Sequence, residues 1–224
     1  MVFLILILGV IQSPSYHLVK IKKGDTFYKL FEKDWQLIAR FNRLDEKHLV
    51  VGREIKVPKD LEMLRNWTPM PENHVPAMSY DKYILIKLGE QFLGFYKNGK
   101  LIFDAPISSG RSPDRCDSPI GNCSTPIGFS FVLGGDKNHV SSIYNDSTGA
   151  PYPMDWAIRF YVNKSMVQYW IHSGDLPGYP DSHGCVRLTK YDAEKLFNLV
   201  FEKYPETEFW IPKKKQQTIV EITN

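Results

Sequence analysis

The chain has 224 residues, of which 43% are hydrophobic, and this length and composition suit one sizeable globular domain together with a small one. Its 28 Lys and Arg against 25 Asp and Glu leave a formal net charge of +3, which is too mild to indicate a nucleic-acid-binding protein. The only dense basic run, at residues 213–215, is typical of a solvated tail, although it also suits an anionic cell-wall or membrane surface.

The first fifteen residues, MVFLILILGVIQSPS, predict an export signal. Their apolar stretch is shorter than a membrane-spanning helix, which needs about 20 residues. Small residues at 13–15 suit a signal peptidase, so we expect cleavage before Tyr16. No basic residue precedes the apolar stretch, which leaves a buried strand as the alternative. We interpret residues 1–15 as a leader and expect an extracytoplasmic protein, in the periplasm or the cell wall.

Residues 16–59 predict a small domain with the order strand, helix, helix, strand. A strand-like stretch at 16–21 ends at a turn around Gly24, and a second stretch at 54–57 ends at Pro58. Between them, apolar residues recur with the spacing of two short helices. These residues are Phe27, Leu30 and Phe31 in the first helix, and Leu37, Ile38 and Phe41 in the second.

Three segments of this small domain, KKGDTFYKLF, IARFNRL and VVGREIKVP, resemble the LysM consensus. Phe27 replaces the usual leucine and Val51 replaces the usual proline, and both changes are mild. The resemblance implies binding of a glycan that contains N-acetylglucosamine. The implied binding residues are Gly24, Asp25 and Thr26 in one loop, and Asn42, Arg43 and Leu44 in another.

A purely structural role is the alternative for the first of these loops. Gly24 can make the turn, and Asp25 or Thr26 can cap the first helix. The structural and the glycan-binding roles are compatible with each other.

Residues 60–79 are rich in proline and lack periodicity, so we expect a linker or an arm that lies on the surface. Residues 80–212 then alternate strand-like runs with turns and predict a mostly antiparallel β domain. The clearest hairpin is FYKNGKLIF, because Asn98 and Gly99 accept the positive φ angles of a type I′ turn.

The end of this domain changes to helical spacing. Thr189 is expected to cap a helix, and a last strand is expected at 207–211. Residues 213–224 are expected to form a basic tail. One face of the helix carries Ala193, Leu196, Phe197 and Val200.

The three cysteines divide into a pair and a single residue. Cys116 and Cys123 enclose the loop CDSPIGNC, and in an oxidising compartment a disulfide there would stabilise the fold by about 2.5 kcal/mol. This pairing leaves Cys185 without a cysteine partner in the chain. In an exported protein, an odd cysteine beside histidines is either an intermolecular bridge or a reactive thiol.

The segment IHSGDLPGYPDSHGCVRL, residues 171–188, concentrates groups that suit thiol chemistry. A cysteine attacks as thiolate, and an imidazole from His172 or His183 is expected to lower the pKa of Cys185. Gly184 leaves room for a substrate carbonyl beside backbone amides that can bind an oxyanion. Arg187 supplies a charge suited to a carboxylate.

Two other interpretations of this segment stay open. His172, His183 and Cys185 can supply three zinc ligands, with Asp175 or Asp181 as the fourth, although the spacing matches no compact zinc motif. The other alternative is a buried structural cysteine among surface histidines.

The same segment resembles the active-site motif of the L,D-transpeptidases, the YkuD-like catalytic domain. The family pattern is a histidine, a loop, and then Ser/Thr-His-Gly-Cys-x-Arg/Asn, which here is His172 followed by residues 182–187. Upstream, STPIGFSFV resembles the Thr-Pro-x-Gly strand of the family, and PYPMDWAIRF resembles its segment with Met-Pro-Tyr. For residues 80–212 the resemblance implies a mainly β, sandwich-like catalytic domain with a helix after the cysteine.

The resemblance also implies a role for each residue of the motif. Cys185 would be the nucleophile and His172 its base, with the imidazole oriented by the carbonyl of Ser173. His183 would support the site, and the amides of Gly184 and Cys185 would hold the oxyanion. Substrate contacts are implied at Arg187, Ser182, Tyr152 and Met154.

By this resemblance the protein is an L,D-transpeptidase. It forms a thioester with a peptidoglycan tetrapeptide, releases D-Ala and transfers the acyl group to an amine, without metal or cofactor. The expected partners are peptidoglycan stem peptides, glycan strands and an anchored cell-wall protein as acceptor, but no nucleic acid. Asp181 replaces a small residue of many relatives and is expected to tune donor or acceptor preference. The alternatives are a carboxypeptidase or crosslink hydrolase with the same cysteine, and a non-enzymatic wall-binding protein.

Overall fold

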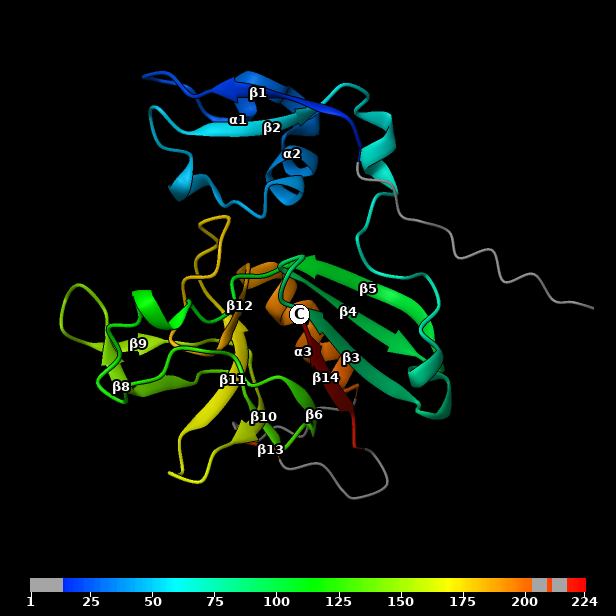
Figure 1. Cartoon of the computed structure of the whole chain (residues 1–224), viewed down its shortest axis with the longest axis vertical. Helices are drawn as coiled ribbons and strands as arrows, with labels where there is room; N and C mark the ends of the chain where they lie inside the picture. The colour runs from blue at the N-terminus through cyan, green and yellow to red at the C-terminus, as the bar shows by residue number, and fades with distance from the viewer. Residues whose placement is uncertain (1–13, 203–208, 211–216) are drawn as a thin grey trace, which may run out of the picture.

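The computed structural model describes residues 14–202, 209–210 and 217–224. Most of the predicted leader, the lysine run and most of the strand expected at 207–211 lie outside these ranges. Figure 1 shows a small N-terminal domain above a larger domain made mainly of strands, which confirms the expected fold class. No helix within the described ranges is long and apolar enough to cross a membrane.

The small domain has the predicted order of strand, helix, helix, strand. Its two strands form an antiparallel pair, and its first helix is capped by Thr26, which accepts a hydrogen bond from the Lys29 amide at 3.1 Å. Ile38 and Phe41 of the second helix are buried against Ile55 of the second strand. The elements are β1 (Tyr16–Lys20), α1 (Phe27–Phe31), η1 (Glu32–Asp34), α2 (Trp35–Phe41), η2 (Glu46–His48) and β2 (Glu54–Pro58).

The larger domain contains two five-stranded sheets, with the strand orders β5-β4-β3-β14-β6 and β12-β11-β10-β7-β13. Most pairs are antiparallel as predicted, but β3 with β14 and β11 with β12 are parallel. Asn98 and Gly99 join β4 to β5 with φ angles of 50° and 82°, so the hairpin is confirmed. The elements are β3 (Lys82–Lys87), β4 (Phe92–Lys97), β5 (Lys100–Pro106), η5 (Pro113–Arg115), β6 (Gly128–Phe131), β7 (Gly134–Asp136), β8 (Val140–Asn145), β9 (Pro151–Pro153), β10 (Ala157–Val162), β11 (Gln168–Ser173), β12 (Val186–Leu188), α3 (Lys190–Val200), β13 (Phe209–Trp210) and β14 (Ile219–Thr223).

One hydrophobic core joins the two sheets and α3. Ile84 and Phe95 come from the first sheet, Ile171 and Val186 from the second, and Leu196 from the helix. Side chains alternate between the two faces of a strand. The opposite face of β11 and β12 therefore points away from this core.

Residues 60–79 are an arm rather than a free linker. Met70 and Ala77 are fully buried with Tyr83, Phe92 and Tyr96, on the face of the first sheet that lies opposite the main core. The arm therefore covers a surface that would otherwise expose aromatic side chains. It contains two 3-10 segments, η3 (Glu62–Arg65) and η4 (Val75–Ser79).

The prediction of a basic tail at residues 213–224 is wrong for the second half of this segment, which contains β14. β14 lies between β3 and β6, with Ile219 opposite Tyr83 in the parallel register, and Val220 is buried. The segment TIVEIT alternates apolar and polar residues and is rich in β-branched side chains, which are both strand signals. These signals were outweighed by the neighbouring lysine run, which is typical of a solvated tail.

The predicted helix cap is confirmed and gives a stability test. Thr189 accepts a hydrogen bond from the Asp192 amide at 3.1 Å at the start of α3. We expect Thr189→Ala to lower the free energy of unfolding by about 1 kcal/mol, measured by urea denaturation. Thr189→Ser keeps the hydroxyl and should remain close to wild type. Equal loss in both variants would contradict the capping role.

Candidate active site

The pairing of β11 with β12 places the predicted catalytic side chains on one face. His172 is the register partner of Arg187 in this parallel pair. Register partners in a parallel pair point to the same side of the sheet, and so do residues two apart along one strand. Trp170 and Cys185 therefore share that face with His172 and Arg187, on the side away from the core.

A pocket of about 560 Å³ opens over this face. It is lined by His172, His183 and Cys185 together with the predicted substrate residues. The β8–β9 pair closes one side, where Met154 packs in a small cluster with Trp170 and Cys185. The predicted substrate residues in the lining are Tyr152, Met154, Ser182 and Arg187.

His172 is held as a neutral imidazole. Its side chain is buried, and its Nδ1 lies 2.6 Å from the carbonyl oxygen of Ser173. Because a carbonyl only accepts hydrogen bonds, the proton is on Nδ1 and Nε2 is left as the acceptor. Burial lowers the pKa of His172 to about 3, although the Ser173 carbonyl acts in the opposite direction. The imidazole is therefore neutral at neutral pH, with its Nε2 unprotonated.

Cys185 is held as a neutral thiol. Burial raises its pKa to about 11, although a backbone hydrogen bond at Trp170 and the charge of Arg187 act in the opposite direction. The expectation that an imidazole lowers this pKa is therefore wrong for the free protein. The difference arises because His172 is buried, so that forming an imidazolium–thiolate pair carries a desolvation cost.

His183 contacts a segment that sequence reasoning did not connect to the site. Its Nε2 lies 2.8 Å from Oδ1 of Asp117, and its ring stacks on Tyr144 with centroids 4.2 Å apart and planes 8° apart. The hydrogen bond with His183 is also the main reason why the pKa of Asp117 is lowered. His183 is therefore fixed on two sides at the rim of the pocket. Asp117 is far away in sequence, so no local motif indicates it.

Ser182 and Gly184 shape the turn before the cysteine. The buried Ser182 hydroxyl accepts a hydrogen bond from the Gly184 amide at 3.0 Å and donates one to the Cys185 carbonyl. Gly184 has a φ of +116°, and a Cβ there would lie 2.6 Å from the ring of Tyr169. Only glycine fits this position without strain. The amide of Gly184, expected to face an oxyanion, is thus already bonded within the turn.

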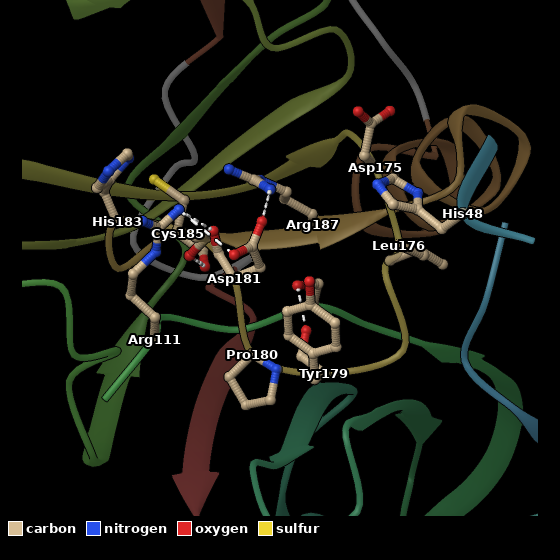
Figure 2. A network of polar contacts seen from close by, with 12 residues as sticks. His48, Arg111, Asp175, Leu176, Tyr179, Pro180, Asp181, His183, Cys185 and Arg187 are labelled. Carbon is tan, nitrogen blue, oxygen red and sulfur yellow. Dashed lines mark hydrogen bonds and ion pairs between the residues drawn. The ribbon is translucent and has the colours of Figure 1, made fainter. Parts of the chain in front are cut away.

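Charged side chains form a network beside the thiol. Figure 2 shows Asp181 between Arg111 and Arg187, and its carboxylate lies 3.4 Å from the first guanidinium and 3.6 Å from the second. Arg111 also pairs with Asp117 at 2.7 Å. The charge of Arg187 is therefore partly compensated by Asp181, the residue that departs from the family pattern.

Cys116 and Cys123 form a disulfide in the structure. The ring that they close carries Asp117, which contacts His183, and Ser118, whose hydroxyl bonds to that of Tyr144. The loop closed by the disulfide therefore contacts the rim of the pocket through these two hydrogen bonds.

Removal of this disulfide should weaken the fold. We expect the double variant Cys116→Ser/Cys123→Ser to lose about 2.5 kcal/mol of unfolding free energy, because the open ring gains conformational entropy in the unfolded chain. Urea denaturation measures the loss, and reduced wild-type protein should match the variant. An unchanged unfolding midpoint would contradict this account.

The structure does not bring together the zinc ligands considered from the sequence. Within the described ranges, one group of acid, histidine or cysteine side chains is close enough to share an ion, namely Asp117, Cys123 and His183. The sulfur of Cys123 is in the disulfide and offers no thiolate. His172, Cys185, Asp175 and Asp181 are not in this group.

The residues predicted to bind glycan have structural roles in the small domain. Gly24 has a φ of +87°, and Asp25 accepts a hydrogen bond from the Lys22 amide at 2.8 Å. The Asn42 side chain donates to the Lys56 carbonyl and accepts from its amide, each at 2.8 Å, so it fastens the end of α2 to β2. The turn at Gly24 and the helix cap at Thr26, which were the structural alternative, are therefore confirmed. Glycan contact by these residues and Thr26 stays a prediction.

Comparison with known families and structures gives consistent matches. The family model of the L,D-transpeptidase catalytic domain, YkuD, matches residues 81–213, and that of the LysM domain matches residues 19–58. No curated protein sequence gives a significant match.

The chain matches three solved structures among others, and the first of them has a similar fold. The L,D-transpeptidase of Xylanimonas cellulosilytica has a TM-score of 0.53 and 18% identity, over 95% of this chain and 99% of that one. L,D-transpeptidase 1 of Mycobacterium tuberculosis has a TM-score of 0.42 and 20% identity, over 64% of this chain and 62% of that one. The catalytic domain of the E. faecium L,D-transpeptidase has a TM-score of 0.39 and 22% identity, over 64% of this chain and 97% of that one. The chain thus spans about three fifths of the length of the mycobacterial relative.

Proposed function

Because the L,D-transpeptidase catalytic domain matches more than half of the chain, the protein belongs to the L,D-transpeptidase family, and we propose that it is an exported enzyme that acts on peptidoglycan. The observation that carries the proposal is the shared face of β11 and β12. There Cys185 and a neutral His172 with a free Nε2 line one pocket.

The first step is acylation of Cys185 by a tetrapeptide stem. The sulfur attacks the carbonyl carbon of the third residue, at the L-centre of its diamino acid, while the thiol proton moves to Nε2 of His172. The imidazolium then gives this proton to the amine of the leaving D-Ala. A thioester forms, the peptide bond breaks, and the Ser173 carbonyl stabilises the transient charge through Nδ1.

The second step is transfer of the acyl group to an amine. His172 takes a proton from the amine as the nitrogen attacks the thioester, and the sulfur leaves as a thiol when it receives the proton back. The acceptor is the side-chain amine of another stem or of an anchored wall protein. Neither step needs a metal or a cofactor. We assign the oxyanion contact to the Cys185 amide, and substrate contacts to Arg187, Tyr152 and Met154.

The experiment is incubation of the wild type and of Cys185→Ala with a disaccharide-tetrapeptide. Mass spectrometry of the intact protein and of the small products follows both steps. Release of D-Ala with formation of dimer, dependent on Cys185, is the expected result. Tripeptide without dimer would indicate the carboxypeptidase or hydrolase instead, and the absence of any Cys185-dependent product would favour a wall-binding protein without activity.

A further inference from the structure

The small domain is docked on residues 174–181, which join the strand of the candidate base to the turn before the candidate nucleophile. We call this segment the catalytic loop. The Asp45 amide donates to the Leu176 carbonyl at 2.9 Å, and the Asp45 carboxylate accepts a hydrogen bond from the Leu176 amide at 2.7 Å. Arg53 of the small domain donates to the carbonyl of the next loop residue, Pro177. The middle of the catalytic loop is therefore held by groups of the other domain.

The Asp45 carboxylate is itself held in place within the small domain. Its Oδ1 accepts a hydrogen bond from the His48 amide at 3.1 Å and lies 2.6 Å from Nδ1 of the same residue. These contacts cap η2 and leave Oδ2 directed at the Leu176 amide. Figure 2 shows His48 beside the catalytic loop. The carboxylate is thus oriented for the loop before it binds, which lowers the entropic cost of the contact.

Further contacts fix the small domain from other sides. Arg40 of α2 pairs with Asp104 of β5. The Trp67 ring of the arm packs edge-on against Phe41 and Phe92, with centroids 4.8 and 5.7 Å away. The two domains therefore have a defined relative position, and the small domain can act as a support for the catalytic loop.

The residues that precede Asp45 belong to the same contact between the domains. Leu44 is buried and forms an antiparallel bridge with Pro177. Nε of Arg43 donates to the Glu90 carbonyl of the catalytic domain at 3.0 Å. Arg43 and Leu44 are residues that the LysM resemblance implies for glycan binding, and in this position they contact the catalytic domain. The small domain thus has a direct structural link to the larger domain.

The start of the catalytic loop is part of the active site. Ser173 presents the carbonyl that bonds Nδ1 of His172 at 2.6 Å, and the next amide, that of Gly174, donates to the Leu188 carbonyl at 2.8 Å. The Ser173 carbonyl and the Gly174 amide share one peptide plane, so the course of the loop sets the direction of the carbonyl. Gly174 also lies on the Arg187 side chain, because a Cβ there would be 3.0 Å from its Cδ. A shift of the loop would therefore reach both the base and the arginine.

We propose that Asp45 is a positioning residue for the reaction at Cys185, because it holds the catalytic loop in the course that directs the Ser173 carbonyl at the imidazole. This assignment rests on the proposed function, since it makes the small domain a support for the reacting groups. Without the Asp45 carboxylate, the Leu176 amide loses its acceptor and the loop can take other courses. The His172 ring then spends less time in the orientation that accepts the thiol proton, and a small misplacement of a catalytic group slows a reaction strongly.

The test is the release of D-Ala from free tetrapeptide by the full-length Asp45→Ala protein. This substrate carries no sugar, so glycan binding by the small domain does not contribute to the rate. We expect kcat to fall about tenfold and KM to stay within about twofold of wild type, because the orientation of the base changes and the substrate contacts remain. Asp45→Asn keeps a side-chain oxygen that can accept from the Leu176 amide, so it should recover most of the loss.

Lys47→Ala is the matched control for contact with the catalytic loop. Lys47 pairs with Asp175 at 2.8 Å, but its side chain is 74% exposed, and such surface pairs contribute little. This variant should keep the wild-type kcat. An unchanged kcat in Asp45→Ala would overturn the proposal. Equal losses in the Asp45→Ala and Lys47→Ala proteins, or in the Asp45→Ala and Asp45→Asn proteins, would overturn it as well.

Hydrogen exchange of the Leu176 amide, measured by mass spectrometry, follows the catalytic loop without any turnover. We expect about tenfold faster exchange in Asp45→Ala, because the hydrogen bond that protects this amide is lost. If the wild type releases no D-Ala and exchange is faster in the variant, the transpeptidase is removed and Asp45 remains a support of the loop. If the wild type releases D-Ala and exchange is unchanged, only the role of Asp45 is removed.

Discussion

Replacement of His172 by glutamine is expected to slow the release of D-Ala by about 10³-fold, which is a typical contribution of a positioned general base. The thiol of Cys185 is protonated at neutral pH because its pKa is about 11, so attack requires a group that takes the proton as the bond forms. Nε2 of His172 is the acceptor in the same pocket, and its Nδ1 is already bonded to the Ser173 carbonyl. Glutamine offers no comparable base.

The rate is measured with free tetrapeptide under single-turnover conditions. His17→Gln serves as the matched control, since His17 is exposed on β1 and should keep the wild-type rate. Urea denaturation checks that His172→Gln remains folded. If His172→Gln keeps more than about one tenth of the wild-type rate, His172 is not the general base, because loss of such a group slows a reaction by about 10²-fold or more.

Alkylation of Cys185 by iodoacetamide should become about a thousandfold faster between pH 7 and pH 10. A raised pKa means that the folded protein retains the thiol proton, so below about pH 11 the thiolate fraction grows about tenfold with each pH unit. Intact-protein mass spectrometry follows the reaction. Cys116 and Cys123 are in a disulfide, so one alkyl group should be added.

The same profile in His172→Gln tests what sets the thiol pKa. Burial is its main cause, so the slope should persist without the imidazole. A plateau above about pH 8 in the wild type would instead reveal a thiolate stabilised by an imidazolium.

The sequence predicted which residues share the pocket better than it predicted their protonation states. The motif around Cys185 indicated the residues, but His172 lies thirteen positions earlier, and only the parallel pairing of β11 with β12 places them on one face. The pKa values depend on how deeply the β8–β9 pair and the core bury both groups. No pattern of residue types reports that depth.

Long-range contacts account for what the sequence did not predict. Asp117 reaches His183 from a ring far away along the chain, and Asp45 reaches Leu176 from the other domain. In the arm, Trp67 lies in a proline-rich stretch whose apolar residues have no periodicity, so nothing in the pattern indicates that its ring packs between the domains. By contrast, the hairpin at Gly99 and the cap at Thr189 are local, and both were predictable.

The position of β14 has a consequence for biosynthesis. Its residues 219–223 separate β3 from β6, and Thr223 contacts Ile86 across 137 positions of sequence. The first sheet therefore stays split, and the main core open, until residue 223 has left the ribosome. Pairing over such a separation is slow because the long loop must close before the contact forms. The larger domain of a nascent chain therefore completes its first sheet only after residues 219–223 are made, whereas the small domain has a core of its own that is synthesised much earlier.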